Sequence, residues 1–320
     1  MTLNNIVLKH GYGQVFSRKD VNINICDKKG QIFDGPVILS NMPSVQNDVI
    51  LKKFSNNYWP YVRHRIDGPE KIYDFVVKTN KEDWEHISIS IGVQDADLEL
   101  IRKIKSEKLR IDWLTIDVAF IYNKNYNHFI NDIRELIPSA YLIAGNFTNA
   151  HVLQWLKNLG VDAAKFGIGQ SNLCRTRQYT GFGTTVNDLI ECGNEAQRIG
   201  IDLINDSGLT IIDEENGEVA LGDIFKAINF GAKWQMSSSL FRWCPELANA
   251  EGLIEQYGNS TARAKGFNRN QEGAVKLYKT NNITVEERFQ QIKEALQSSV
   301  SYSGNTELYS CYNSCKYEII

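Results

Sequence analysis

The strongest constraint on the fold is a repeated alternation of short apolar segments with longer amphipathic ones. Parallel strands buried on both faces are short and continuously apolar, whereas the helices that cover them carry one apolar stripe. The first pattern occurs eight times, at 36–40, 58–62, 86–92, 111–119, 140–146, 162–169, 200–206 and 232–238. The second pattern lies between them, over 68–80, 95–107, 128–137, 150–160, 186–200 and 221–231. This alternation favours an α/β fold of the (β/α)8 TIM barrel type, with a doubly wound open sheet as the alternative.

The chain after the eighth strand pattern departs from this alternation. Residues from roughly 245 to 280 are weakly periodic and rich in Gly and Asn, which predicts a mobile flap with partial helix, or alternatively a disordered surface connection. Residues 284–300 predict a C-terminal helical extension, which begins at a T-x-x-E capping box. The apolar end of the chain is expected to pack near the N-terminus. We therefore expect one barrel domain over residues 1–320.

Composition narrows the class of partner. The chain has 35 Lys+Arg against 38 Asp+Glu, a formal net charge of −3, and no basic block. This charge balance argues against a dedicated nucleic-acid binder but leaves room for a pocket that binds one phosphate. The longest apolar runs are too short for a transmembrane helix, so we expect no membrane partner. The polar N-terminus does not resemble a secretory signal, so the six cysteines are interpreted as reduced thiols of a cytoplasmic protein.

One loop carries the candidate chemistry. The segment KFGIGQSNLCRTR (165–177) begins where a predicted strand ends and opens the longest of the strand–helix loops. Active sites of barrels lie on the loops that follow the strands. Cys174 lies at the tip of this loop and Thr176 follows two residues later. The thiolate is a candidate nucleophile, but a single cysteine is also often a small buried apolar residue, and the residues alone leave both interpretations open.

The stretch GIGQSNLCRTRQYTGFGT resembles the cysteine loop of the IMP dehydrogenase/GMP reductase family, whose pattern is G-I-G-P-G-x-x-C-x-T followed by T-G-x-G. Further segments resemble the family in the same order along the chain, closest to its bacterial GMP reductase branch: VILSNM (37–42), YVRHRID (61–67), SISIGV (88–93), TIDVA (115–119), IAGN (143–146), INDSG (204–208), FGAKWQMSSSLF (230–241), QYGNS (256–260), QEG (271–273) and LQSSVSYSGNTEL (296–308). The length leaves no room for the inserted regulatory domain of IMP dehydrogenases. The flap also lacks their Arg-Tyr pair, because neither Arg263 nor Arg269 is followed by Tyr.

This resemblance implies an NADPH-dependent oxidoreductase that converts GMP to IMP and ammonia. Cys174 would attack C2 of the purine and form a covalent intermediate, and a hydride would then reach C2. Thr176 and Glu272 would supply the proton that an amine leaving group needs. The resemblance also implies a homotetramer.

The resemblance further assigns binding roles. Asp206 would bind the ribose hydroxyls, with a carboxylate that only caps neighbouring amides as the alternative. Asp117 and Gly92 would lie at the nicotinamide cofactor, although a buried structural Asp is an equally open interpretation. The remaining substrate residues would be Asn146, Asn172, Gly208, Ser238, Ser239, Tyr257, Gly258 and Ser260. A potassium ion would bind the backbone carbonyls of Gly169, Ser171 and Cys174.

Departures from the family pattern gather in the segments that, by this resemblance, would bind the phosphate of the nucleotide. G-P-G becomes Gly169-Gln170-Ser171, D-G-G becomes Asp206-Ser207-Gly208, and I-G-S becomes Ser237-Ser238-Ser239. Because glycines let backbone amides approach a phosphate closely, the substrate is expected to be GMP or a related ligand such as a deoxynucleotide, a nucleoside or an altered purine. Two other functions stay open, an IMP dehydrogenase without its regulatory domain and a non-catalytic purine-nucleotide-binding barrel.

Overall fold

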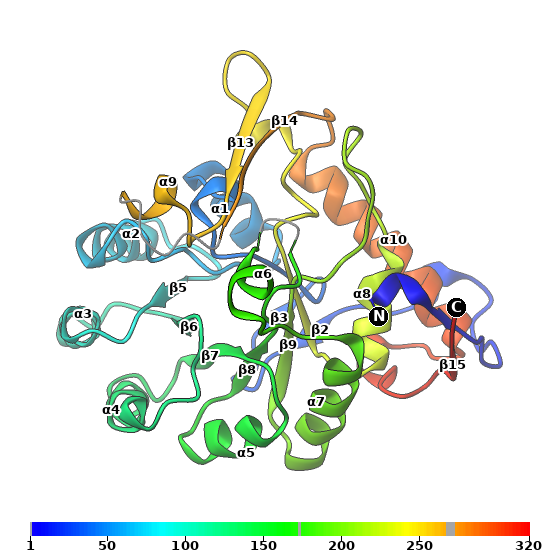
Figure 1. Ribbon diagram of the computed structural model, residues 1–320, viewed down its shortest axis with the longest axis horizontal. Coiled ribbons are helices and arrows are strands. Elements are labelled where there is room, and N and C mark those ends of the chain that lie inside the picture. Colours follow the sequence, from blue (N-terminus) through cyan, green and yellow to red (C-terminus); the bar gives the residue numbers. More distant parts are fainter. Residues whose placement is uncertain (1, 172–173, 267–272) are drawn as a thin grey trace.

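A curled parallel sheet organises the protein (Figure 1). The computed structural model describes residues 2–171, 174–266 and 273–320. Within them, seven parallel strands are hydrogen-bonded in the order β4-β12-β9-β8-β7-β6-β5. Their bounds are β4 (Val37–Leu39), β5 (Ser88–Ile91), β6 (Trp113–Asp117), β7 (Tyr141–Phe147), β8 (Ala163–Phe166), β9 (Asp202–Asp206) and β12 (Trp234–Ser237). Each lies inside a segment predicted as a strand, apart from the last residue of β7.

The eighth predicted strand, 58–62, is not a regular strand, and the barrel prediction is confirmed only in part. Isolated parallel bridges join Leu39 to Tyr61 and Arg63 to Ile89, so this segment contacts both edges of the seven-stranded sheet. The irregularity has a local cause, because Pro60 has no N–H to donate and Tyr58 adopts a left-handed φ of 54°. The structure therefore shows a curled sheet with an irregular connection at residues 61–63, which we call the seam.

Helices surround the sheet in the predicted alternation (Figure 1). The predicted helices are α2 (Pro69–Lys81), α3 (Asp95–Ser106), α4 (Asn127–Leu136), α5 (His151–Asn158), α7 (Val186–Ile199), α8 (Gly222–Asn229) and α10 (Val285–Ser303). The capping box of α10 is present, with Glu287 N–H donating to Thr284 Oγ1. In the described ranges, three helices were not predicted individually: α1 (Asp48–Asn56), α6 (Thr176–Thr180) and α9 (Ala262–Lys265). No helix in the described part of the chain combines the length and apolar character needed to cross a membrane.

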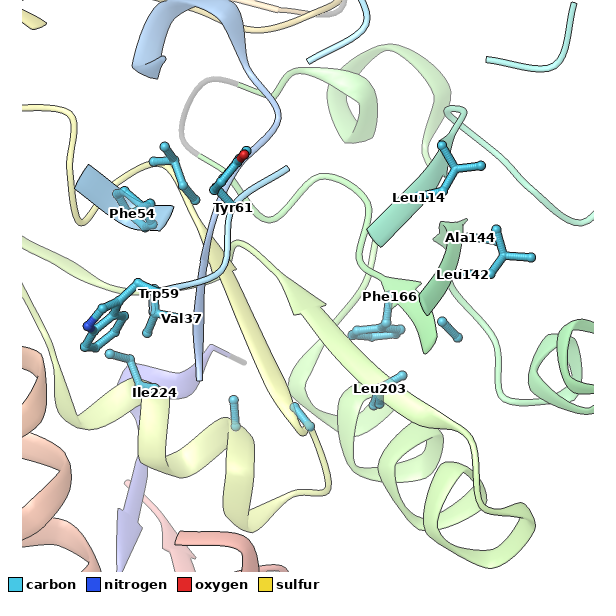
Figure 2. Close-up of a cluster of buried hydrophobic side chains, with 14 of the residues drawn as sticks. Val37, Phe54, Trp59, Tyr61, Leu114, Leu142, Ala144, Phe166, Leu203 and Ile224 are labelled. Atoms are coloured by element: carbon cyan, nitrogen blue, oxygen red, sulfur yellow. The ribbon is translucent and has the colours of Figure 1, made fainter. Parts of the chain in front are cut away.

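Alternation along the strands divides the apolar residues into two cores. One set packs between the sheet and the helices, and Figure 2 shows several members, among them Val37, Leu114, Leu142 and Leu203. The neighbouring positions form a separate cluster inside the curled sheet: Ile25, Phe33, Ile38, Val62, Trp113, Tyr141, Ile143, Ala163, Ile204, Trp234 and Met236. Because side chains alternate with a period of two, residues 117, 165 and 206 continue this inner set toward the carboxyl ends of their strands.

Four antiparallel pairs among the described residues complete the fold. They are β1 (Ile6–Leu8) with β15 (Tyr317–Ile319), β2 (Ile25–Cys26) with β3 (Ile32–Phe33), β10 (Ile211–Asp213) with β11 (Glu218–Val219), and β13 (Leu253–Tyr257) with β14 (Val275–Lys279). The first pair confirms that the chain end packs near the N-terminus. The last pair adds a β-hairpin to the segment 245–280, in which α9 supplies the predicted partial helix.

Candidate functional site

A cavity of about 410 Å³ opens at the carboxyl ends of the central strands. It brings together most of the sequence-predicted residues, namely Asp117, Asn146, Gly169, Ser171, Cys174, Thr176, Asp206, Gly258 and Ser260. The volume lies within the usual range for small-molecule sites. A larger groove of about 750 Å³ lies between β1 and the end of α10, but no predicted site residue lines it. We therefore assign the candidate active site to the cavity that contains Cys174.

Cys174 and Thr176 face each other across the start of α6. The Cys174 Sγ donates to Thr176 Oγ1 over 3.2 Å, and the thiol is partly exposed. The Cys174 N–H donates to the Ser171 carbonyl at 3.0 Å, which fixes the loop tip. An isolated antiparallel bridge joins Cys174 to Gly273, at the start of the chain leading into β14. The cysteine is therefore held between the loop after β8 and the β13–β14 hairpin, with a hydroxyl beside its sulfur.

The floor of the cavity is a charged cluster centred on Lys165. This ammonium is 2% exposed and lies 2.9 Å from Asp117 Oδ1 and 3.2 Å from Asp206 Oδ2. Burial alone would lower the pKa of Lys165, but the two carboxylates outweigh burial and raise it. Burial likewise favours a higher pKa for Asp117, but the charges of Lys165 and Arg65 outweigh it and the pKa is lowered. Lys165 therefore stays charged and holds Asp117 ionised in a nearly solvent-free position.

Asp206 is oriented from several sides. Its Oδ2 accepts hydrogen bonds from Asn146 Nδ2 at 2.9 Å and from Lys165, and its Oδ1 accepts from Ser207 Oγ at 3.3 Å. A carboxylate has about four acceptor positions, so this set leaves capacity for a ligand hydroxyl. Asn146 also donates to the Gly167 carbonyl at 2.6 Å, which ties the ends of β7 and β8 to Asp206.

A second cavity, of about 240 Å³, adjoins the first, since Gln170, Ser171 and Ser207 line both. It contains the predicted Gly208, Ser238 and Ser239, together with Leu209, Ile211 and Arg242. Ser207 stands where the family pattern has glycine, and its φ is 75°. A side chain in this left-handed region costs about 1–2 kcal/mol. The departure from D-G-G thus preserves a glycine-type backbone and adds a hydroxyl at the junction of the two cavities.

Two predicted residues lie apart from the cavity walls. Gly92 sits after β5, where its nearest side-chain neighbour is Asp97, and it does not line the cavity. Arg65 also lies next to Gly92, and no sequence pattern indicated this contact. Tyr257 contributes its backbone carbonyl, which accepts from Ser44 Oγ at 2.8 Å, while the cavity wall begins at the following residue. Two further predicted residues, Asn172 and Glu272, lie outside the described residues.

Comparison with known proteins agrees with this arrangement. The model of the IMP dehydrogenase / GMP reductase domain matches residues 4–315. The chain belongs to the IMP dehydrogenase/GMP reductase family. It is 32% identical over 303 residues to a GMP reductase of Staphylococcus aureus (strain JH9), covering 92% of this chain and 88% of that protein. It is 30% identical over 293 residues to a GMP reductase of Staphylococcus carnosus (strain TM300), covering 88% and 86%.

Sequence reasoning missed three charged residues of the cavities: Arg65, described above, and the two buried residues Lys165 and Arg242. Lys165 had a usable signal, because it is the one charged residue in the otherwise apolar stretch AAKF of β8. Arg242 had none, because the sequence places it in an ordinary loop. Both are at most 2% exposed. No group of three or more His, Cys, Asp or Glu side chains that could hold a metal ion occurs among the described residues.

Proposed function

We propose that this chain catalyses the NADPH-dependent reductive deamination of GMP, or of a closely related purine nucleotide, to IMP and ammonia. The observation that carries the proposal is the Cys174 thiol, 3.2 Å from the Thr176 hydroxyl in a cavity shared with Asp206, in a chain of this family. A nucleophile beside a proton-transferring group is what substitution at an electron-poor purine carbon requires.

The proposed reaction has two halves. In the first, the Cys174 sulfur bonds to C2 of the purine, the C2–N bond breaks, and the amine leaves as ammonia after it gains a proton. Thr176 relays that proton, with Glu272 as the proposed acid/base partner. In the second half, C2 receives a hydride, the C–S bond breaks, and its electron pair returns to sulfur as IMP is released. Covalent catalysis divides one difficult substitution into two easier steps.

The other residues of the cavity bind and orient. Asp206 accepts the ribose hydroxyls, and Asn146 and the 258–260 loop confine the purine. The proposed NADPH supplies the hydride when it is bound, and the cavity wall formed by Arg65, Asp117 and the 118–119 backbone offers both charges and apolar surface to a nicotinamide amide. Backbone carbonyls of Gly169, Ser171 and Cys174 lie in one loop, and such oxygens suit a potassium ion. The Ser171 carbonyl accepts a hydrogen bond from the Cys174 N–H at 3.0 Å.

The proposal also covers the domain organisation, the cellular location and the assembly of the protein. We infer that residues 1–320 act as one (β/α)8 barrel domain in which the seam replaces one regular strand. The resemblance to the bacterial branch supports a cytoplasmic homotetramer. Sedimentation of the purified protein at several concentrations tests the assembly.

A turnover assay tests the function. Purified protein with NADPH and GMP is followed by the loss of reduced-nicotinamide absorbance, and IMP and ammonia are quantified at the end. We expect cysteine-dependent oxidation, and none with Cys174→Ala, while Cys26→Ala, at an exposed cysteine outside the cavity, keeps full activity. Reduction of NAD by the protein in the presence of IMP would favour a dehydrogenase. Nucleotide binding without turnover of any purine would favour a non-catalytic barrel.

A further inference from the structure

The seam loses its strand partner where β4 ends. Parallel pairing joins the two as far as Leu39, whose N–H donates to the Pro60 carbonyl at 3.1 Å and whose carbonyl accepts from the Val62 N–H at 3.3 Å. The chain then turns away from the sheet into a short 3-10 helix. In a continued parallel ladder, the Val62 carbonyl and the His64 N–H would bond to the residue two positions after Leu39. These two polar groups therefore need another partner.

The side chain of Gln46 takes that place. Its Nε2 donates to the Val62 carbonyl at 2.6 Å, and its Oε1 accepts from the His64 N–H at 3.1 Å. A primary amide offers a donor and an acceptor, as a backbone peptide group does. The same Nε2 also donates to the Ser40 carbonyl at 2.8 Å. The amide thus replaces one missing residue of the ladder and joins the loop after β4 to the seam.

Burial makes these hydrogen bonds matter. Gln46 is 8% exposed, and Val62 and His64 are buried. A buried donor or acceptor that loses its partner bears the full desolvation penalty of that group. Without the amide, the backbone on either side of His64 would therefore have to shift to pair its polar groups again.

The two segments that Gln46 joins both contribute to the cavity that holds Cys174. Ser40 lies in its lining, and so does Arg65, which directly follows His64. Arg65 Nε donates to the Asp117 carbonyl at 2.9 Å and lies 3.6 Å from Asp117 Oδ2. Gln46 does not line this cavity itself. It can therefore influence the cavity only through the residues whose backbone it holds.

We propose that Gln46 is a positioning residue that fixes Arg65 in the part of the cavity wall where the proposed NADPH would bind. This inference rests on the proposed function for the identity of the cofactor. Cys174 and Asp206 lie on other segments, after β8 and at the end of β9, and the three hydrogen bonds of the Gln46 amide go to residues 40, 62 and 64. Gln46 therefore acts on the cofactor side of the site and not on the purine side.

Hydrogen exchange in Gln46→Met tests the contact itself. Methionine keeps the length of the side chain and removes the amide. Exchange is followed by mass spectrometry of overlapping fragments that cover residues 61–67, because local opening is reported amide by amide. The His64 amide loses its acceptor, so it should exchange about ten-fold faster than in the wild type. The amides of β7 and β8 should exchange as in the wild type.

Steady-state kinetics of the same variant test the positioning role. A displacement of about 1 Å in a positioned group can cost on the order of 100-fold, and a partial shift of Arg65 should raise the KM for NADPH about ten-fold. The KM for GMP should change by less than about two-fold, because the segments of Cys174 and Asp206 keep their places. If Gln46→Met does not fold, Gln46→Asn makes the same comparison, since its amide is one methylene too short to reach all three partners.

A matched control is Gln31→Met. Gln31 Nε2 donates to the Glu85 carbonyl at 3.1 Å, and its Oε1 lies 3.0 Å from His86 Nδ1, but Gln31 lines neither cavity. Its loss should leave both KM values unchanged.

Three results would overturn the inference: unchanged exchange of the His64 amide, an unchanged KM for NADPH, or equal rises of both KM values. A wild type that binds neither NADPH nor GMP would contradict the proposed function instead. Faster exchange of His64 in Gln46→Met would then still support Gln46 as the residue that holds this backbone.

Discussion

Replacement of Lys165 by Met tests the electrostatic organisation of the cavity floor. Methionine has a similar length but no charge, so Lys165→Met leaves Asp117 and Asp206 beside an apolar side chain. The side chains of both carboxylates are less than one-fifth exposed. Removing one partner of a buried ion pair costs about 3–5 kcal/mol, because the other charge stays desolvated. That loss is a large part of the 5–15 kcal/mol that typically stabilises a domain.

The sign of the pH dependence follows from the lowered pKa of Asp117 in the wild type. A carboxyl whose pKa is lowered on folding stabilises the protein above its unfolded pKa of about 3.9, and the contribution is lost as the pH falls. In Lys165→Met, burial acts on Asp117 without the opposing ammonium, so its pKa should rise. The folded variant then takes up protons more readily than the unfolded chain. The difference in unfolding free energy between wild type and variant should therefore narrow from pH 7 toward pH 4.

Urea unfolding at pH 7 and pH 4.5, followed by circular dichroism, measures this difference. The control is Lys78→Met, which removes an ion pair of 2.7 Å to Asp48 whose side chains are 44% and 58% exposed. Exposed pairs contribute about 0–1 kcal/mol, so the control should change little at either pH. A loss for Lys165→Met no larger than that of the control would refute the reasoning. A loss of the expected size that does not change with pH would refute the role assigned to Asp117.

Two further predictions concern backbone strain and a buried histidine. Ser207→Gly should raise the unfolding free energy by about 1 kcal/mol, since glycine adopts the φ of 75° without a side-chain penalty; a lower stability would show that the hydroxyl contributes more than the strain costs. His86 is 1% exposed, and burial lowers its pKa to about 3. The unfolded chain protonates this histidine near pH 6.5, so the unfolding free energy of the wild type should fall as the pH falls from 7 to 4. The unfolding free energy of His86→Asn should fall less over the same range. Parallel curves of unfolding free energy against pH would contradict this.

The sequence predicted the strand and helix order well because buried parallel strands and amphipathic helices have distinct periods. The same approach did not predict the antiparallel hairpins, because their strands show neither of these two periods. In β13 (LIEQY) and β14 (VKLYK), apolar residues are mixed with Glu, Gln and Lys without a regular alternation, so the sequence resembles a polar surface segment when the partner strand is unknown. It also failed at 58–62, where Pro60 interrupts an apolar run that otherwise resembles a strand.

The parts of the site that could be predicted are those whose residues lie close together in the sequence. Cys174 and Thr176 lie two residues apart in one loop, and the alternation of β8 places Lys165 on the same inner face as Ala163. Arg242 depends on partners in two other segments, Tyr278 and Glu214, and no local pattern reports such a contact. The structure places the predicted Gly92 outside the cavity lining, whereas the neighbouring Arg65 belongs to it.

The seam has a consequence for motion in the native state. Regular strands exchange their amide hydrogens slowly because many neighbouring hydrogen bonds must open together. At residues 61–63 the connection to each neighbouring strand is a single isolated bridge, and Pro60 contributes no donor. Two residues further on, Arg65 Nε donates to the Asp117 carbonyl at 2.9 Å and lines the cavity. The amides of Val62 and Arg63 should therefore exchange before those of β6–β8, and this local opening would take place next to the Arg65 side of the cavity wall.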